Sequence, residues 1–189
     1  MTLPNKLTIG RILVIPAMIV IASIPYLNNT IFFQGVSLGA FINMVLFALA
    51  SFTDFLDGHI ARSRNLVTTF GKFADPLADK MLVLTSFLIL LANGDYIPMW
   101  TVAVILLREL MVSGVRLVAA ERGEVIAAGW SGKVKTATTM IALIFLFLYG
   151  TCYVMDIIAL VLLYISVALT IYSGIEYLWN SRKIIFESI

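Results

Sequence analysis

The chain has 189 residues, of which 61% are hydrophobic and only 13% are charged. A typical soluble domain has about 45–50% apolar and about 25% charged residues, so the composition excludes an ordinary water-soluble domain and indicates a membrane protein. The net charge of +2 gives no support for a nucleic-acid partner, and the single cysteine, Cys152, excludes an intramolecular disulfide framework and a cysteine-based metal site.

Six apolar runs follow one another along the chain, and each approaches the roughly 20 residues that a membrane-crossing helix needs. Residues that favour turns, such as the Asn93-Gly94 pair, separate the runs. Lys6 and Arg11 resemble the start of a secretory signal, but the five later runs favour an uncleaved first span. The predicted spans are Ile9–Ile24, Ile31–Asp54, Pro76–Ala92, Pro98–Val118, Val134–Thr151 and Ile157–Tyr177. We therefore expect an all-α, polytopic membrane protein with six transmembrane helices, and one domain over residues 1–189.

The positions of lysine and arginine predict the orientation of these spans, because positive charges collect on the cytoplasmic side of a membrane. With the N-terminus inside, the residues at or near the inner side are Lys6, Arg11, Arg62, Arg64, Lys72, Lys80, Arg116, Arg122, Lys133, Lys135, Arg182 and Lys183. Only Arg108 lies deep within a span, and the outer junctions carry acids such as Asp95 and Asp156. We expect a multi-pass protein of the cell membrane with both termini in the cytoplasm.

Four aspartates lie where the second span ends and the third begins. Asp54, Asp57, Gly58, Ala61 and Arg62 have the spacing of one helix face, and so do Gly71, Asp75 and Asp79. Because Asp75 precedes Pro76, it either caps the third span or lies where that helix kinks. The spacing thus predicts an acidic cluster at the cytoplasmic face.

Carboxylates this close together repel one another, and divalent cations would remove much of that repulsion. Carboxylate oxygens are preferred ligands for Mg²⁺ and are also compatible with Mn²⁺. Two ions held by shared aspartates could neutralise a diphosphate. Small residues such as Gly58 and Ala61 would let a bulky ligand approach, and Arg62 offers a planar fork to a phosphate or a nucleotide carbonyl.

The eight fixed positions of this pattern resemble the signature of the CDP-alcohol phosphatidyltransferase family. They are Asp54, Asp57, Gly58, Ala61, Arg62, Gly71, Asp75 and Asp79. The resemblance implies a metal-dependent enzyme with two ions, Mg²⁺ or Mn²⁺, in the active site. The six-span architecture is also similar to that family, and the resemblance implies a homodimer.

The resemblance also implies roles for single residues. Asp54, Asp57 and Asp75 would hold the first ion, and Asp54, Asp75 and Asp79 the second. Asp79 would in addition be the catalytic base that takes the proton from the acceptor alcohol. The residues expected at the CDP-lipid are Asn5, Thr8, Gly58, Ala61, Arg62 and Gly71.

Cations in the second half of the chain predict an anionic acceptor. Arg108 is a candidate because an arginine within a span is costly and commonly functional, although a structural pair with Glu109 is the alternative. Arg116, Lys133 and Lys135 lie toward the same membrane face as the aspartates, with membrane-surface anchoring as the alternative for the two lysines. We expect these four residues to bind the acceptor phosphate.

The segments at Arg108-Glu109-Leu110 and Trp130–Thr136 resemble the bacterial family members that make phosphatidylglycerophosphate. That resemblance implies CDP-diacylglycerol and sn-glycerol 3-phosphate as substrates, with CMP as the second product. Inositol phosphate, serine or phosphatidylglycerol are alternative acceptors within the family. A cation transporter is the alternative from another class, since carboxylates within spans also mark ion paths.

Overall fold

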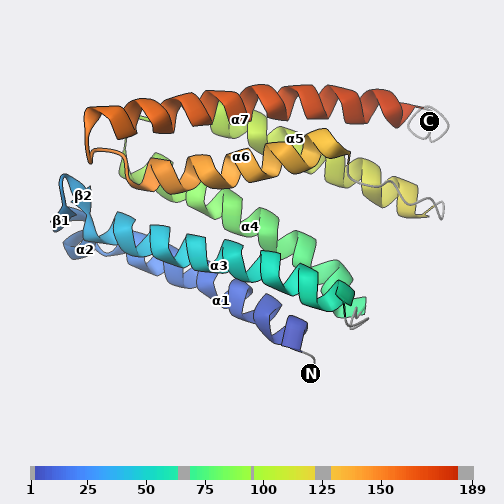
Figure 1. The fold of residues 1–189 in the computed structure, drawn as a ribbon, viewed down its shortest axis with the longest axis horizontal. Coiled ribbons are helices and arrows are strands. Elements are labelled where there is room, and N and C mark those ends of the chain that lie inside the picture. The colour runs from blue at the N-terminus through green and yellow to red at the C-terminus, as the bar shows by residue number, and fades with distance from the viewer. Residues whose placement is uncertain (1–2, 64–68, 95, 122–128, 183–189) are drawn as a thin grey trace. The chain divides into compact units, whose positions relative to one another are not determined.

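The structure is a computed structural model that describes residues 3–63, 69–94, 96–121 and 129–182. Within these ranges the side chains of residues 3, 4, 6, 54–63, 69, 70, 72 and 73 are not described. The described chain is almost entirely helical, as expected (Figure 1). Its long helices are α1 (Leu3–Ser23), α3 (Leu38–Ser63), α4 (Thr69–Asn93), α5 (Met99–Glu121), α6 (Trp130–Phe147) and α7 (Tyr153–Asn180). Each of them overlaps one of the six predicted spans.

A short helix and a small hairpin connect α1 to α3. Helix α2 (Pro25–Asn29) is followed by strands β1 (Ile31–Phe33) and β2 (Val36–Ser37), which pair antiparallel. Gln34 and Gly35 form the turn with φ values of 38° and 96°, and positive φ at both central residues is typical of a two-residue hairpin. The prediction that the second span begins at Ile31 was therefore wrong. The Ile-Phe-Phe sequence is apolar enough to read as a membrane run, but the Gln-Gly pair after it favours a turn.

Helix α4 begins earlier than the third predicted span. It starts at Thr69 and continues through Pro76, so the predicted start at Pro76 was wrong. Proline cannot donate a backbone hydrogen bond, but its fixed φ is compatible with helical geometry. Asp75 accordingly lies inside the helix and does not cap it. Helix α3 likewise extends nine residues beyond the predicted end at Asp54, to Ser63.

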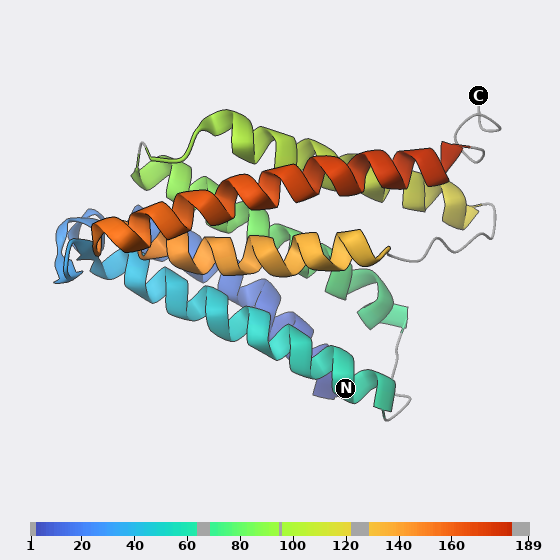
Figure 2. The same ribbon diagram turned by 45° about the horizontal axis from the view of Figure 1, so that its top comes forward.

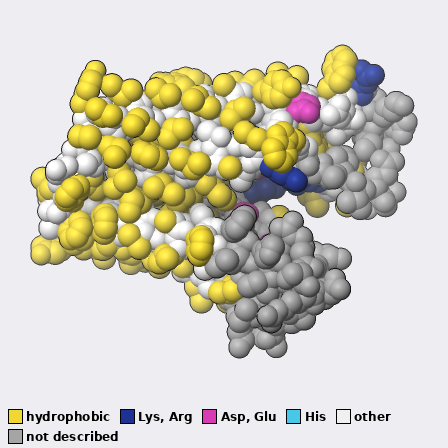
Figure 3. Space-filling view, viewed as in Figure 1, with side chains coloured by type: hydrophobic (Ala, Val, Ile, Leu, Met, Phe, Trp, Pro, Cys, Tyr) yellow, Lys and Arg dark blue, Asp and Glu magenta, His cyan; other side chains and the backbone are white. Residues whose placement is uncertain are grey.

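Helix α7 has the length and composition of a membrane-crossing helix. Of the described residues, only this helix, Tyr153–Asn180, is both long and apolar enough, with a mean hydropathy of 2.5 over its most apolar window. Only 28% of that window is buried inside the protein, unlike the core helix of a soluble domain. The shorter segments Leu7–Ser23 and Leu38–Thr53 are also apolar. Hydrophobic side chains cover most of the described surface in the view of Figure 3, which fits a lipid environment.

The chain divides into two compact units. Unit 1 comprises Met1–Tyr96 with Leu143–Ala159, and unit 2 comprises Ile97–Ala142 with Leu160–Ile189. In unit 1, α1 packs against both α3 and α4, as the two ribbon views show (Figures 1 and 2). The side chains of Met18, Phe47 and Leu82 are fully buried in this unit.

Unit 2 contains α5, the first part of α6 and most of α7. Ile105 and Leu163 are fully buried, and the rings of Trp100 and Tyr164 lie 6.2 Å apart. Each unit thus has its own buried apolar residues. The expectation of a single domain over the whole chain stays a prediction.

Candidate active site

The acidic face of α4, in unit 1, is the first candidate site. Gly71, Asp75 and Asp79 follow one another at intervals of four within one continuous helix, so the prediction that they share a face is confirmed. Gly71 is buried, whereas the side chain of Asp79 is 31% exposed. The face therefore presents a carboxylate that a ligand can reach.

Helix α1 supplies two buried side chains to this acidic face. Thr8 Oγ1 donates a hydrogen bond to Asp75 Oδ1 over 2.5 Å, and Arg11 Nη1 lies 3.4 Å from Asp79 Oδ1. Thr8 and Arg11 are 1% and 2% exposed. Their spacing of three residues places them one helical turn apart, so each faces one of the two aspartates, which are themselves one turn apart. Asn5 precedes Thr8 by one further turn on α1.

Arg11 was missed as a site residue, because the sequence analysis placed it only among the cations at or near the cytoplasmic side. A signal was present nevertheless. Arg11 stands one turn after Thr8, inside a run that is otherwise apolar. A buried arginine needs a charged or strongly polar partner, since an unpaired charge in an apolar interior is very costly. That requirement points to a carboxylate of another helix.

The other half of the predicted acidic cluster lies on α3. The backbone of Asp54, Asp57, Gly58, Ala61 and Arg62 is helical, but their side chains lie outside the described residues. Among the described side chains, no group of three or more His, Cys, Asp or Glu could hold a metal ion. Since Asp54 and Asp57 are not among those side chains, the four-aspartate metal site stays a prediction.

A network of buried charges in unit 2 is a second candidate site, described by itself. Arg108 Nη1 donates to Glu109 Oε1 over 3.1 Å, and Arg108 Nη2 donates to Ser173 Oγ over 3.1 Å. Lys135 Nζ donates to the same Glu109 oxygen, Oε1. The structure therefore brings together Arg108 and Lys135, two of the four predicted acceptor-binding cations. It also contains the ion pair between Arg108 and Glu109, which was the alternative to a role of Arg108 in acceptor binding.

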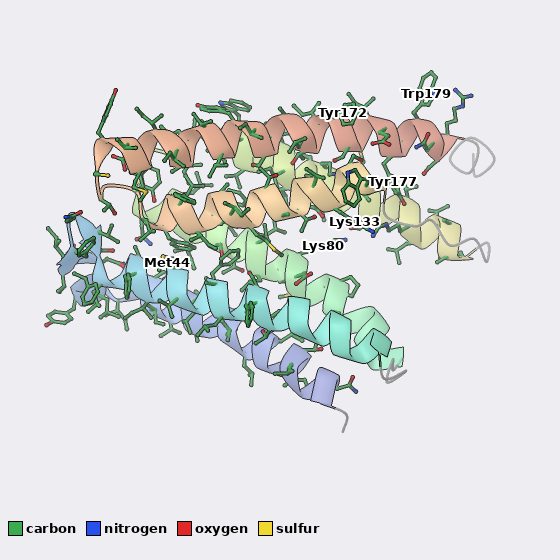
Figure 4. All side chains as sticks on the ribbon, in the orientation of Figure 1. Met44, Lys80, Lys133, Tyr172, Tyr177 and Trp179 are labelled. Atoms are coloured by element: carbon green, nitrogen blue, oxygen red, sulfur yellow. The ribbon has the colours of Figure 1, made fainter. Side chains whose placement is uncertain are left out.

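The two lysines of α6 have different surroundings. Lys135 is 3% exposed, whereas Lys133 is exposed at the beginning of the same helix, where Figure 4 labels it. Residues two apart on a helix point to different sides, which explains the difference. Exposure of Lys133 is compatible with acceptor binding and with membrane anchoring. Its role stays a prediction.

Arg116 contacts an aromatic ring of α7. Its guanidinium carbon lies 5.6 Å from the centre of the Tyr177 ring, within the range of a cation–π interaction. Tyr177 is 9% exposed and Trp179 is 67% exposed, and Figure 4 shows them extending from opposite sides of α7. Tyr177, Glu109 and Ser173 were not predicted to belong to a site. Their contacts between α5, α6 and α7 depend on helix packing that the sequence does not display, whereas the Arg108–Glu109 pair joins sequence neighbours.

The two sites differ in the chemistry that they can perform. The described carboxylates of unit 1 provide oxygen ligands for hard cations and a group that can accept a proton. The guanidinium and ammonium groups of unit 2 provide donors for an oxyanion such as a phosphate.

A comparison with known protein families makes the assignment specific. The family model described as CDP-alcohol phosphatidyltransferase matches residues 1–172. The chain belongs to the CDP-alcohol phosphatidyltransferase family, as the spacing of the aspartates predicted.

Similar proteins are named for one reaction within this family. A Bacillus subtilis protein named CDP-diacylglycerol–glycerol-3-phosphate 3-phosphatidyltransferase is 42% identical over 188 residues, which cover 96% of this chain and 97% of that protein. Proteins of the same name from Rickettsia felis and Haemophilus influenzae are 42% and 35% identical, covering 96% and 99% of this chain and 96% and 97% of their own lengths. The reaction in these names is the one that the sequence predicted.

Proposed function

We propose that this protein is an integral membrane enzyme that transfers the phosphatidyl group of CDP-diacylglycerol to sn-glycerol 3-phosphate. The products are phosphatidylglycerophosphate and CMP. The observation that carries this proposal is the similarity over almost the whole chain to several proteins named for this reaction. The buried cations of unit 2 support an anionic acceptor, because choline or ethanolamine would call for acids or an aromatic cage.

The transfer needs a base near the acceptor hydroxyl. An alcohol becomes a nucleophile when a positioned group accepts its proton as the attack proceeds. In the proposed reaction the acceptor oxygen bonds to the phosphatidyl phosphorus, the bond from that phosphorus to the CMP oxygen breaks, and Asp79 accepts the hydroxyl proton. The partial exposure of Asp79 and its ion pair with Arg11 support this role, since the carboxylate is reachable and held in position.

A divalent ion fits the donor set of the acidic cluster. Asp75 and Asp79 are hard oxygen donors one turn apart, and the hydroxyl of Thr8 fixes one oxygen of Asp75. We propose that Asp54, Asp57, Asp75 and Asp79 hold two ions, Mg²⁺ or Mn²⁺. Bound there, the ions would neutralise the negative charge of the diphosphate. The CDP-lipid would then contact Asn5, Thr8, Gly58, Ala61, Arg62 and Gly71.

The remaining proposals concern the acceptor and the membrane. Arg108, Arg116, Lys133 and Lys135 bind the phosphate of the acceptor in this proposal. The six long helices cross the cell membrane with both termini and the active site on the cytoplasmic side. The two units act as one domain, and the enzyme forms a homodimer.

Product identification tests the proposed function. Purified protein would receive CDP-diacylglycerol, Mg²⁺ and one acceptor from a panel of glycerol 3-phosphate, inositol phosphate, serine and phosphatidylglycerol. We expect CMP release and a lipid of the mass of phosphatidylglycerophosphate with glycerol 3-phosphate alone. Turnover with another acceptor would replace the proposed substrate. A lack of CMP release with every acceptor, together with cation flux in proteoliposomes, would favour the transporter.

A further inference from the structure

Glu109 is the one acidic side chain described within the network that links α5 to α6 and α7. It follows Arg108 directly on α5, and one of its carboxylate oxygens, Oε1, accepts hydrogen bonds from both Arg108 and Lys135. The side chains of Arg108, Glu109 and Lys135 are 12%, 14% and 4% exposed. The three charges are therefore largely withdrawn from solvent. Their mutual interactions are stronger in this interior than they would be in water.

The side chain of Arg108 is held on several sides. Glu109 accepts from Nη1 and Ser173 accepts from Nη2, each over 3.1 Å. Ser173 in turn donates to the carbonyl oxygen of Thr170 over 3.3 Å. A Cβ atom built at Gly174 would lie only 3.1 Å from Arg108 Cγ, so the arginine stem runs close against α7. These contacts define the plane of the guanidinium group.

The Oε1 atom of Glu109 also holds the two cations close to each other. Two like charges in a largely dry interior repel each other, and a carboxylate that accepts from both offsets that repulsion. An arginine has five N–H donors and a lysine has three. The Nε atom of Arg108 is buried and has no hydrogen-bond partner among the described residues, so Arg108 keeps a donor beyond those that contact Glu109 and Ser173. The carboxylate of Glu109 fixes the positions of both cations, and the three side chains together carry a net single positive charge.

We propose that Glu109 is a positioning residue that sets the affinity of the enzyme for its anionic acceptor. It acts through Arg108 and Lys135 and does not touch the reacting atoms. The inference rests on the proposed function, because it assumes that these two cations bind the acceptor phosphate. Its consequence is specific to one substrate. Loss of the carboxylate weakens the acceptor site and leaves the affinity for the CDP-lipid unchanged.

The test compares Glu109→Gln with Glu121→Gln. Both substitutions remove one negative charge from α5, but Glu121 is exposed at the end of that helix. We expect Glu109→Gln to raise the KM for glycerol 3-phosphate about tenfold, which corresponds to one charge-assisted hydrogen bond. The KM for CDP-diacylglycerol should stay within about twofold of the wild type. Glu121→Gln should leave both constants unchanged.

A double-mutant cycle separates positioning from a general structural role. If Glu109 acts through Lys135, the substitution Glu109→Gln should have less than about a threefold effect in a Lys135→Ala background. Equal effects in both backgrounds would overturn the proposal, and so would an unchanged KM for the acceptor. A parallel loss of affinity for both substrates would assign Glu109 to the fold.

Ser173→Ala provides a second test of how Arg108 is held, and it serves if the Glu109 variant does not fold. It removes only the hydroxyl that accepts from Arg108 Nη2, and a rise of about threefold in the acceptor KM is expected. No rise in that variant would overturn the proposed fixing of Arg108. Failure of the proposed function would be seen separately, because the wild type would then form no phosphatidylglycerophosphate. In that case the same KM comparison would use the acceptor that the panel identifies.

Discussion

The ion pairs described in unit 1 and unit 2 differ in how much of the carboxylate is accessible. In unit 1, the buried Arg11 of α1 faces Asp79, whose side chain is 31% exposed. In unit 2, Arg108 and Lys135 share Glu109, whose side chain is only 14% exposed. An accessible carboxylate can serve as a ligand or a base, whereas cations fixed by a shared acid present defined donors. The two units thus offer different chemistry: an oxygen ligand or base in unit 1, and donors for an oxyanion in unit 2.

Neutralising the accessible carboxylate of Asp79 should have the largest effect. Asp79→Asn should lower kcat by about 10²–10⁴-fold, because the amide cannot accept the proton of the acceptor hydroxyl. CMP release at saturating substrates measures the loss, and a thermal-shift assay with CDP-diacylglycerol checks that the nucleotide still binds. Glu121→Gln, on an exposed position of α5, is the charge-matched control. Normal turnover of the Asp79 variant would remove Asp79 from the role of base.

A smaller effect is expected from the buried hydroxyl that fixes Asp75. Thr8→Val keeps the shape of the side chain but removes the donor, and a hydrogen bond to a charged group contributes about 1.5–3 kcal/mol. We expect kcat/KM for CDP-diacylglycerol to fall by about tenfold or more. Thr8→Ser retains the hydroxyl and should remain close to the wild type. Equal activities of the two variants would show that the hydroxyl is dispensable.

A steric change in unit 2 would displace Arg108 without altering any charge. Gly174→Ala would place a Cβ 3.1 Å from Arg108 Cγ, so the arginine stem must shift by a few tenths of an ångström. We expect the KM for glycerol 3-phosphate to rise by about threefold, and the KM for the CDP-lipid to stay constant. Gly132→Ala is the matched control, because its Cβ would lie 3.8 Å from Arg108 Nη2, at ordinary contact distance. Identical kinetics of both variants would show that the stem has room to move.

The smallest effect is expected at Tyr96, in the connection between α4 and α5. Tyr96 donates from its hydroxyl to the carbonyl oxygen of Leu146 over 3.3 Å, and its ring stacks on Tyr149 at 4.1 Å. Tyr96→Phe should cost about 1 kcal/mol of stability and leave kcat unchanged. Burial raises the pKa of the Tyr96 hydroxyl above its ordinary value of 10.0. Stability from this group is therefore present below pH 10 and falls as the pH rises further, a trend that the Phe variant should lack.

Thermal unfolding in detergent at neutral pH and at pH 11 measures this difference between Tyr96→Phe and the wild type. Loss of enzyme activity in the Phe variant would contradict a purely structural role for the hydroxyl. The same result would also show that activity depends on residues outside the acidic face of α4 and the network of Arg108, Glu109 and Lys135.

The sequence predicted those features that depend on local spacing. The apolar runs predicted the six long helices. The interval of four residues predicted that Asp75 and Asp79 share one face of α4. The hairpin at Ile31–Ser37 was missed because its apolar strand resembles the beginning of a membrane span. The ion pair between Arg11 and Asp79 could not be predicted from the sequence either. Its two members are 68 residues apart, and only the packing of α1 against α4 brings them together.

The position of Glu109 beside Arg108 has a consequence for biogenesis. A lone arginine at the centre of a membrane helix opposes insertion by about 2.5–3.5 kcal/mol. Since acid and base are neighbours on α5 and pair at 3.1 Å, that helix carries its own counter-ion before any other helix is present. Lys135 arrives later in synthesis, on α6, and finds the carboxylate already in place. In the proposed six-span topology, the chain order therefore lets α5 enter the lipid as a nearly neutral segment and adds the extra positive charge only when the helices assemble.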